Sequence, residues 1–270
     1  MSSIRGTPGM AAALLVLALT GNSAVADTTS AAIGFVGDTD SSSWRGASMG
    51  LDEINVAGRF IGYEFSLESV DAGDIPDGLV ALVVAADAKS VKGLVERHPD
   101  LPVFNTLAED DDLRTLCPGN LYSIIPSERM RSDAVAQWRE KEPDADVDAV
   151  AHHHRFRRYS SGDLNGRYST TYDEPMTEAA WTAYVAVRLV GDAVTRTQAT
   201  DLETLHGHLH GLTSFDASKG QPLSFRDNGQ LRQPLWIVKD DQVLGEAPVE
   251  GVVDRDDMDT LGIIDGCAEE

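Results

Sequence analysis

Histidines occur at two places in the sequence where metal binding is the chemistry to consider. His206 and His210 are four residues apart in a stretch with helical periodicity, so both side chains face the same way and form a candidate metal pair. No third ligand accompanies them in the sequence, and a solvated helix face is the simpler interpretation. Residues 151–160 (AHHHRFRRYS) hold three consecutive histidines and three arginines. Consecutive side chains diverge, so at most two of these histidines can readily share an ion.

A second group of candidates consists of hydroxyl, carboxylate and aromatic side chains in three loops. The loops 37–43, 86–90 and 106–112 each follow an apolar segment and carry groups that can hydrogen-bond a small polar ligand. Similar side chains also cap helices, so capping is the alternative role in these loops. The candidate ligand-binding residues are Asp38, Thr39, Asp40, Ser41, Ser42, Ser43, Trp44, Asp87, Ser90, Thr106, Glu109 and Asp110.

Two further charged groups admit both a binding role and a structural role. Residues 109–112 are four consecutive acids, but they lack the alternation and tight turn of a calcium loop. A solvated acidic loop that caps the next turn is the preferred interpretation. Arg226 and Arg232 flank an Asn-Gly turn, where they could meet an acidic ligand or partner. We prefer pairing with the many carboxylates of the chain itself.

The elements that must position the three loops alternate between strands and helices. The expected strands are 31–36, 63–67, 79–85, 101–104 and 121–125, and the expected helices are 44–54, 90–98 and 128–138. The run 79–85 (LVALVVA) is apolar throughout, which is typical of a strand covered on both faces. This order predicts an α/β fold with a doubly wound parallel sheet. Ligands of such sheets bind outside the carboxyl ends of the strands, where the three loops lie.

The second half of the chain is expected to complete this sheet with helices and a hairpin. Residues 177–197 are apolar on most sides of a helix, which predicts that this helix is buried. A capping box opens a second helix at 201–212 with a leucine stripe. Residues 223–225 and 235–238 are predicted to pair as a β-hairpin around Asn228-Gly229, and residues 239–241 to turn the chain into a further strand.

The N-terminus has the features of a secretory signal peptide. Arg5 precedes an apolar run, 10–20, that is too short to span a bilayer, and an A-x-A cleavage site ends at Ala26. An uncleaved anchor or a buried N-terminal helix is the alternative. We expect cleavage before Asp27, leaving residues 27–270 as an exported, periplasmic protein that does not span the membrane.

Charge and cysteines narrow the classes of partner and the compartment. The formal net charge of the full chain is −22, which argues against nucleic acid and anionic membrane surfaces as partners. It suits cations, or a saline environment in which acidic surfaces stay soluble. The two cysteines, Cys117 and Cys267, form an even pair in an exported chain, which predicts one disulfide; two free thiols are the alternative.

Motifs of common enzyme classes are absent from the sequence. It contains no nucleophile elbow, H-E-x-x-H motif, P-loop or C-x-x-C pair. Nothing in it calls for a resident cofactor either. We therefore expect a protein that is not an enzyme and carries no cofactor.

Several segments, in order along the chain, resemble one group of ABC-transporter substrate-binding proteins. This group accompanies pyrroloquinoline-quinone-dependent alcohol dehydrogenase systems and belongs to the type I periplasmic binding proteins, the class of the branched-chain amino-acid binders. Each segment alone is weakly specific. Because the segments occur in the same order as in the family, the resemblance as a whole is more specific. The segments are NVAGRFIGYEF (55–65), FNTLAEDDDLRTLC (104–117), IIPSERMRSDAVAQW (124–138), MTEAAWTAYVAVRLVGDAVTRT (176–197), LSFRDNGQLRQP (223–234) and DTLG (259–262), with Cys267 nearby.

The resemblance departs from the family pattern at one point. Type I binding proteins have two α/β lobes that close on a ligand, and in the family a second lobe follows the helix that ends near Trp138. Here a short connector, 139–152, leads directly to a stretch (152–168) that resembles the sequence after that lobe. We therefore expect one α/β lobe. Arg155, Arg157 and Arg158 are expected near the point where the missing lobe would join, paired with the protein's own acids or with a partner. In this interpretation His153 falls on a family histidine position, which weakens the case for metal binding at 151–160.

What the resemblance implies is a non-enzymatic periplasmic solute-binding protein of an ABC transporter linked to quinone-dependent alcohol oxidation. Loops such as 37–43 hold the carboxylate of the ligand in amino-acid binders of this type, but Asp38 and Asp40 would repel an anion and favour a neutral or cationic ligand. The expected partners are a small molecule and an ABC permease or a periplasmic dehydrogenase. Two alternatives stay open: a reduced relative that only docks to such a partner, and a protein that handles a metal or the quinone cofactor.

Overall fold

The computed structural model describes residues 28–213, 215–263 and 267. The predicted signal peptide and the cleavage site between Ala26 and Asp27 lie outside these residues. Within them, none of the helices has the length and apolar character needed to cross a membrane.

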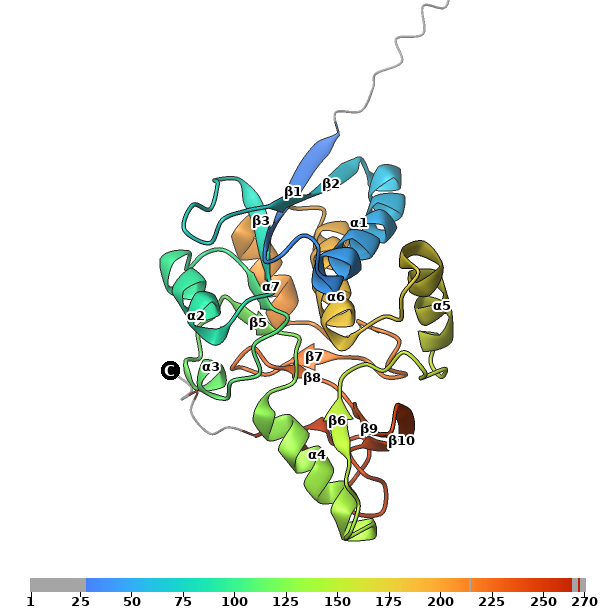
Figure 1. The fold of residues 1–270 in the computed structure, drawn as a ribbon. Coiled ribbons are helices and arrows are strands. Elements are labelled where there is room, and N and C mark those ends of the chain that lie inside the picture. Colours follow the sequence, from blue (N-terminus) through green and yellow to red (C-terminus); the bar gives the residue numbers. More distant parts are fainter. Residues whose placement is uncertain (1–27, 214, 264–266, 268–270) are drawn as a thin grey trace, which may run out of the picture.

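Five parallel strands form the main sheet of the molecule (Figure 1). They are β1 (Thr29–Val36), β2 (Tyr63–Ser69), β3 (Leu79–Val84), β4 (Val103–Asn105) and β5 (Leu121–Ser123), in the order β2-β1-β3-β4-β5. Every neighbouring pair is parallel. The predicted parallel α/β sheet is therefore confirmed, with strand ends within two residues of the expected ones.

Helices cover both faces of this sheet, as a doubly wound fold requires. α1 (Ser42–Ile61) and α6 (Glu178–Thr197) pack against each other and share one hydrophobic core with the sheet, whereas α2 (Ala88–Arg97) belongs to a second core. The side chains of β3 are divided between the two cores, with Val83 in the first and Leu82 in the second. Because both faces of β3 are buried, its sequence is apolar at every position.

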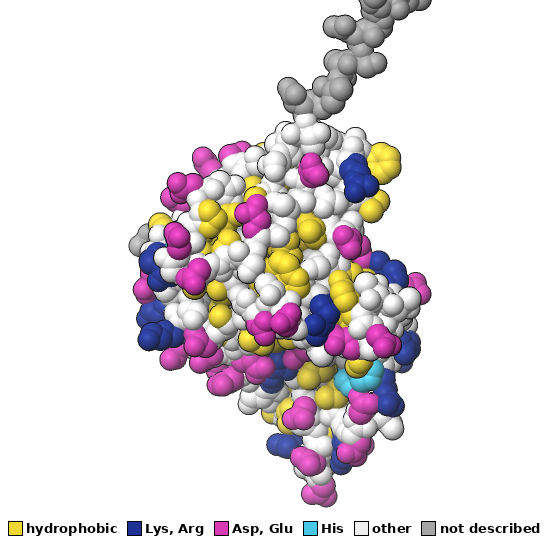
Figure 2. All heavy atoms as spheres, turned by 45° about the horizontal axis from the view of Figure 1, so that its top comes forward, with side chains coloured by type: hydrophobic (Ala, Val, Ile, Leu, Met, Phe, Trp, Pro, Cys, Tyr) yellow, Lys and Arg dark blue, Asp and Glu magenta, His cyan; other side chains and the backbone are white. Residues whose placement is uncertain are grey.

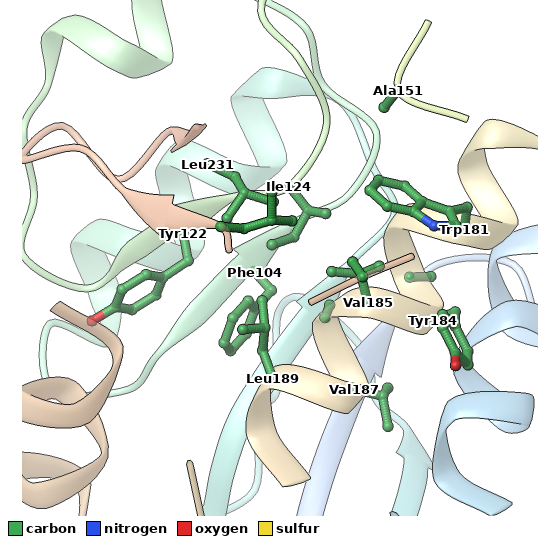
Figure 3. Packing of buried hydrophobic residues seen from close by; sticks show 14 of the residues in the cluster. Phe104, Tyr122, Ile124, Ala151, Trp181, Tyr184, Val185, Val187, Leu189 and Leu231 are labelled. Carbon is green, nitrogen blue, oxygen red and sulfur yellow. The ribbon is translucent and has the colours of Figure 1, made fainter. Parts of the chain in front are cut away.

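The crossing of α1 and α6 depends on a missing side chain. A Cβ atom on Gly46 would lie 1.9 Å from the carbonyl oxygen of Ala180, so only glycine allows the helices to approach this closely. α6 is buried on most sides, as its composition predicts. Figure 3 shows side chains of this helix, among them Val185 and Leu189, near Phe104 of β4.

The remaining helices are α3 (Asp112–Thr115), α4 (Glu128–Lys141), α5 (Ser161–Tyr172), α7 (Leu202–His210) and the 3-10 turn η1 (Met258–Thr260). Among them, α4 and α7 were predicted, whereas α3, α5 and η1 were not. α4 continues three residues beyond its predicted end at Trp138. The predicted leucine stripe is buried at Leu205, Leu209 and Leu212, whereas Leu202 is half-buried.

The predicted hairpin exists, but the pairing partner expected for it is wrong. β7 (Ser224–Phe225) pairs with β8 (Leu231–Arg232), not with residues 235–238. A tight turn reverses the chain over residues 226–230, with Gly229 at φ +75°. Pro234 has no backbone N–H and separates β8 from the next strand, which lets residues 235–238 join another sheet.

That other sheet is small, antiparallel, and lies below the main sheet in the view of Figure 1. It consists of β6 (Asp148–Val150), β9 (Leu235–Lys239) and β10 (Gln242–Ala247) in the order β10-β9-β6. The predicted turn at Asp240 and Asp241 is confirmed, and both residues have positive φ. β6 lies inside the predicted connector 139–152, and α4 packs on all three strands.

The predicted disulfide between Cys117 and Cys267 is confirmed, with the two Cα atoms 5.6 Å apart. It joins the chain just before β5 to the segment that follows η1. The bond therefore ties the C-terminal part of the chain to the main sheet, across a sequence separation of 150 residues.

Candidate ligand site at the carboxyl edge of the parallel sheet

A cavity of about 860 Å³ opens where the carboxyl edge of the main sheet meets the small sheet. Its walls come from α4, from β6 and from the first turn of α6. This volume lies within the range of small-molecule sites, and the edge is where parallel α/β sheets bind ligands. The lining residues are Glu109, Arg131, Ser132, Val135, Ala136, Arg139, Glu140, Val147, Asp148, Ala149, Val150 and Glu178.

Arg131 is the central polar side chain of this cavity. Its Nη2 atom lies 3.0 Å from Glu109 Oε1 and 2.9 Å from Glu178 Oε2, and its Nη1 donates to the carbonyl of Ala149 at 2.5 Å. Burial alone would lower the pKa of Arg131, but the carboxylates of Glu178 and Glu109 raise it above its ordinary value. The guanidinium therefore stays charged between two carboxylates and joins α4 to the loop after β4 and to α6.

Glu178 extends this contact toward β6 and α1. Its Oε1 atom accepts a hydrogen bond from the amide of Ala151, directly after β6. The preceding residue, Thr177, caps α6 by accepting from the amide of Ala180 at 3.1 Å and donates its hydroxyl to Ser42 at 2.9 Å. A continuous line of polar side chains therefore runs along the edge from Ser42 through Thr177, Glu178 and Arg131 to Glu109.

Of the predicted ligand residues, Ser42 and Glu109 lie at the two ends of this polar line. Ser41 acts as a cap: its hydroxyl accepts from the amide of Trp44 at 3.2 Å and donates to the carbonyl of Asp38. Asp38 in turn accepts from the amide of Asp40, so the loop is organised by its own side chains. Thr39 is exposed, Ser43 is buried, and Trp44 packs edge-on against Phe35.

The other predicted residues make hydrogen bonds within the fold and do not line the cavity. Asp87 caps α2 by accepting from the amide of Ser90 at 2.8 Å, and this bond lowers the pKa of Asp87. Thr106 is fully buried and donates to the carbonyl of Val84. Asp110 contributes its backbone carbonyl to the guanidinium of Arg114.

The acidic loop 109–112 is organised around a buried arginine. Arg114 donates to the carbonyls of Ala108, Asp110 and Ile125 and to the side chain of Gln230, all at 2.8–2.9 Å. Burial lowers the pKa of Arg114 to about 10. Asp111 precedes α3 but makes no side-chain cap on it, so the capping of the next turn expected from the sequence is not found there. Its carboxylate accepts instead from the amide of Arg129 in the first turn of α4.

The histidine pair on α7 makes hydrogen bonds within the protein. His206 Nδ1 lies 2.8 Å from the hydroxyl of Tyr122, and its Nε2 lies 3.0 Å from the carbonyl of Asp100. His210 Nε2 lies 2.9 Å from the carbonyl of Gly119. Both rings also pack against Tyr122, so a freely solvated helix face describes this pair incompletely.

Arg226 and Arg232 pair with the chain's own acid, as preferred from the sequence. Their Nε atoms lie 3.0 and 2.9 Å from the same oxygen of Asp259, the middle residue of η1. Arg226 also donates to the carbonyls of Met258 and Leu261, so it holds η1 and the residue after it against the β7–β8 turn.

The stretch 151–160 divides into a buried and an exposed part. His152 is buried, bonded to Asn165 at 2.9 Å and stacked on Trp181, and burial lowers the pKa of His152 to about 3. His153, His154 and Arg155 face Asp241 instead, with Arg155 Nη2 2.6 Å from its Oδ2 atom. Arg155 thus pairs with an acid of the same chain, as expected. Arg157 and Arg158 are exposed.

A second hollow, of about 1090 Å³, lies away from the carboxyl edge between α1, α5 and α6. Glu53 is its central acid: Oε2 accepts from the hydroxyl of Tyr184 at 2.7 Å, and Arg167 and Arg188 pair with the same carboxylate. We place the candidate site at the carboxyl edge because the topology of the sheet directs ligands there.

Arg131, Thr177 and Glu178 were missed by reasoning from the sequence. Each lies at or near the start of a helix, and in this fold several helix starts meet at the carboxyl edge of the sheet. Charged or hydroxyl side chains at the start of a predicted helix would have been the signal, in particular Thr177 and Glu178 at the start of the long apolar helix.

No family model and no curated protein matches the sequence, whereas solved structures match the fold. A branched-chain amino acid ABC transporter periplasmic ligand-binding protein from Burkholderia xenovorans aligns with a TM-score of 0.68 at 11% identity, covering 80% of this chain and 95% of that one. An ABC transporter substrate-binding protein from Desulfitobacterium hafniense gives 0.67 at 12%, covering 80% and 99%.

A third match is the branched-chain amino acid transporter substrate binding protein LivJ from Streptococcus pneumoniae, in complex with isoleucine. Its TM-score is 0.61 at 13% identity, and the alignment covers 82% of this chain and 99% of that one. Identities this low establish the fold and not the ligand. The chain has the α/β fold of the type I periplasmic binding proteins.

Proposed function

We propose that this protein is an exported, non-enzymatic solute-binding protein that serves as the substrate-binding component of an ABC transporter. The observation that carries the proposal is the cavity at the carboxyl edge, in a fold whose solved examples are described as binding proteins of such transporters. The polar line from Ser42 to Glu109 supplies hydrogen-bonding groups at that edge.

The lining of the cavity favours a neutral or cationic ligand with an apolar part. Four carboxylates face two guanidinium groups, and the charge of Arg131 is already shared by Glu109 and Glu178. Between these charges lie Val135, Val147 and three further aliphatic side chains, which would contact the apolar part. The acidic surface adds to this preference, because Figure 2 shows Asp and Glu side chains spread over the visible face.

The finer assignment is a place in a transport system linked to quinone-dependent alcohol oxidation. Its support is the ordered run of family-like segments, several of which build the site. The segment 104–117 contributes Glu109, 124–138 contributes Arg131, and 176–197 contributes Glu178. Short alcohols, aldehydes and amines derived from them are therefore the first solutes to examine, with the quinone itself as a further candidate.

We also propose that the chain lacks the second lobe of two-lobed binding proteins. In the described part of the chain, only β6 lies between α4 and α5, and it pairs with β9 in a sheet of three strands. A one-sided cavity buries less of a ligand than two closing lobes do. The affinity of the isolated protein for its ligand would therefore be low. A second copy or a protein partner would then supply the missing wall.

The test is a thermal-shift panel on the mature, untagged protein, because a specific ligand raises the unfolding midpoint by mass action. The panel contains short alcohols, aldehydes, acids, amines, amino acids and pyrroloquinoline quinone. We expect at least one neutral or cationic compound to raise the midpoint. A panel without any response, repeated in the presence of the permease, would contradict the proposal.

A docking role without ligand capture is the second candidate, and it rests on the same proposed loss of a lobe. Pull-down from periplasm with the mature protein distinguishes the two. Specific capture of a dehydrogenase or permease together with a silent ligand panel favours docking. A monomer that binds a small molecule with micromolar affinity rules docking out as the sole role.

A further inference from the structure

Three side chains near the small sheet point their metal-binding atoms at one place. The Nε2 atoms of His153 and His154 lie 3.3 and 3.5 Å from the same oxygen of Asp241, Oδ1. All three candidate ligand atoms lie within 4.8 Å of one another. The two imidazole rings stack, with their centres 4.7 Å apart, and Asp241 reaches them from the β9–β10 turn.

These spacings are those of ligands around a tetrahedral metal ion. Zinc binds imidazole nitrogen and carboxylate oxygen at about 2.0–2.1 Å, which places neighbouring ligand atoms of a tetrahedron about 3.3–3.4 Å apart. The two observed distances to Asp241 Oδ1 therefore need almost no adjustment. The candidate ligand nitrogens lie within 4.8 Å of each other, so metal binding would also require the two rings to move closer together.

The surroundings of the cluster hold its ligands in place. Arg155 donates to Oδ2 of Asp241 at 2.6 Å, which leaves Oδ1 directed at the imidazoles. His153 is largely buried, with 13% of its side chain exposed, which restricts the movement of its ring. The strongly acidic chain, with a formal net charge of −22, attracts cations.

We propose that His153, His154 and Asp241 form a binding site for a divalent transition-metal ion of the zinc type. Two imidazoles and one carboxylate suit Zn²⁺, Ni²⁺ or Cu²⁺ better than Ca²⁺ or Mg²⁺, which prefer oxygen ligands only. The fourth position of the ion is left for water or for a group of a bound partner. The ion would connect the segment after β6 to the β9–β10 turn.

Binding displaces one hydrogen bond, which gives the site a structural signature. The amide of Arg155 lies 3.3 Å from Nδ1 of His153, an arrangement in which Nε2 carries the proton. A metal at Nε2 moves that proton to Nδ1, so the contact with the Arg155 amide is lost. Imidazole nitrogen chemical shifts report this change of tautomer directly.

The proposal is tested with Zn²⁺ and Co²⁺ on the untagged, metal-free mature protein. We expect saturable binding of one ion by calorimetry and a tetrahedral Co²⁺ absorption spectrum. Asp241→Asn and His154→Gln, both at half-exposed or exposed positions, should each weaken binding by about tenfold or more. His153→Gln should do the same, with its folding checked by circular dichroism.

The matched control is His206→Gln, in the other histidine pair of the chain. Its ring nitrogens lie within hydrogen-bond distance of Tyr122 and Asp100, so this substitution should leave metal affinity unchanged. No saturable uptake by the unmodified protein would overturn the proposal. Uptake that survives Asp241→Asn but is lost in His206→Gln would overturn it as well.

Discussion

The carboxyl edge and the β9–β10 turn show opposite arrangements of charge. At the edge, one guanidinium, Arg131, lies between two carboxylates. At the turn, one carboxylate, Asp241, lies among two imidazoles and the guanidinium of Arg155. The first arrangement is charged on both sides and joins four segments of backbone. The second contains two imidazole rings, and His153 can exchange its hydrogen bond with the Arg155 amide for a metal ion.

The two regions are connected through the residue that follows β6. Ala151 donates its amide to Glu178 of the edge, and its carbonyl accepts from the buried amine of Lys219. Lys219 also donates to the carbonyl of Pro234 at 2.9 Å and lies over the rings of Trp181 and Trp236. The comparison therefore predicts large stability effects at the edge and at this junction, and small ones at the turn.

The largest effect is expected at Lys219, where the two regions meet. Burial lowers the pKa of Lys219 to about 7 in the folded protein, whereas the unfolded chain has the ordinary value of 10.5. Between these values the unfolded state binds more protons, so the free energy of unfolding rises with pH. We expect a rise on the order of 4 kcal/mol from pH 7 to pH 10 that Lys219→Met removes. Urea denaturation at several pH values measures this rise in both proteins. If the free energy of unfolding depends on pH in the same way in both, the amine is not buried as described.

Removing the central cation of the edge is expected to have the next largest effect. Arg131→Met leaves Glu109 and Glu178 without their partner and should lower the free energy of unfolding by about 3 kcal/mol. The control is Arg129→Met on the same helix, whose exposed pair with Asp133 should be worth less than about 1 kcal/mol. Urea denaturation measures both, and equal losses would mean that Arg131 does not join the elements of the edge.

A smaller, acid-dependent effect is expected at His152. Burial lowers the pKa of His152 to about 3, against 6.5 in the unfolded chain, so the unfolded state alone gains a proton as the pH falls below 6.5. Stability at pH 5 should therefore be about 2 kcal/mol lower than at pH 7 on account of this group. His152→Phe should remove that dependence, as followed by thermal melts across this range. An unchanged slope would contradict the buried, neutral ring.

The smallest effect is expected at the turn in the absence of metal. Asp241 has 49% of its side chain exposed, so Asp241→Asn should change the free energy of unfolding by less than about 1 kcal/mol. The same substitution should abolish any rise of the melting midpoint caused by Zn²⁺. A large metal-free loss of stability would remove the contrast between the two regions.

The order of elements was predictable from the sequence, because it depends on local periodicity. The buried run of β3, the apolar helix α6 and the N-cap at Ser41 all follow from patterns within about twenty residues. The strand that pairs with β7 was not predictable, because the sequence of residues 235–238 is equally compatible with pairing to β7 and with pairing to β6. Only the position of Pro234 favours the outcome, and its effect is visible once both sheets are known.

The location of the candidate site was predictable, but of the residues that line its cavity only Glu109 was predicted. Sheet topology places ligands at the carboxyl edge, and Ser42 and Glu109 do lie on the polar line found there. Arg131 and Glu178 are 47 residues apart in sequence and meet only in three dimensions. The histidines show the same limit: helical spacing singles out His206 and His210, whereas the cluster around Asp241 requires a residue 87 positions away from His154.

The central claim is that the cavity around Arg131 binds a small solute. Its most direct test is calorimetric titration of the best compound of the thermal-shift panel into the mature protein, Arg131→Lys and Arg129→Lys. Lysine keeps the charge but cannot bridge two carboxylates as the guanidinium does. We predict binding that Arg131→Lys weakens by about tenfold or more and Arg129→Lys leaves unchanged. Binding that is equal in all three proteins, or absent from all of them, would contradict the account.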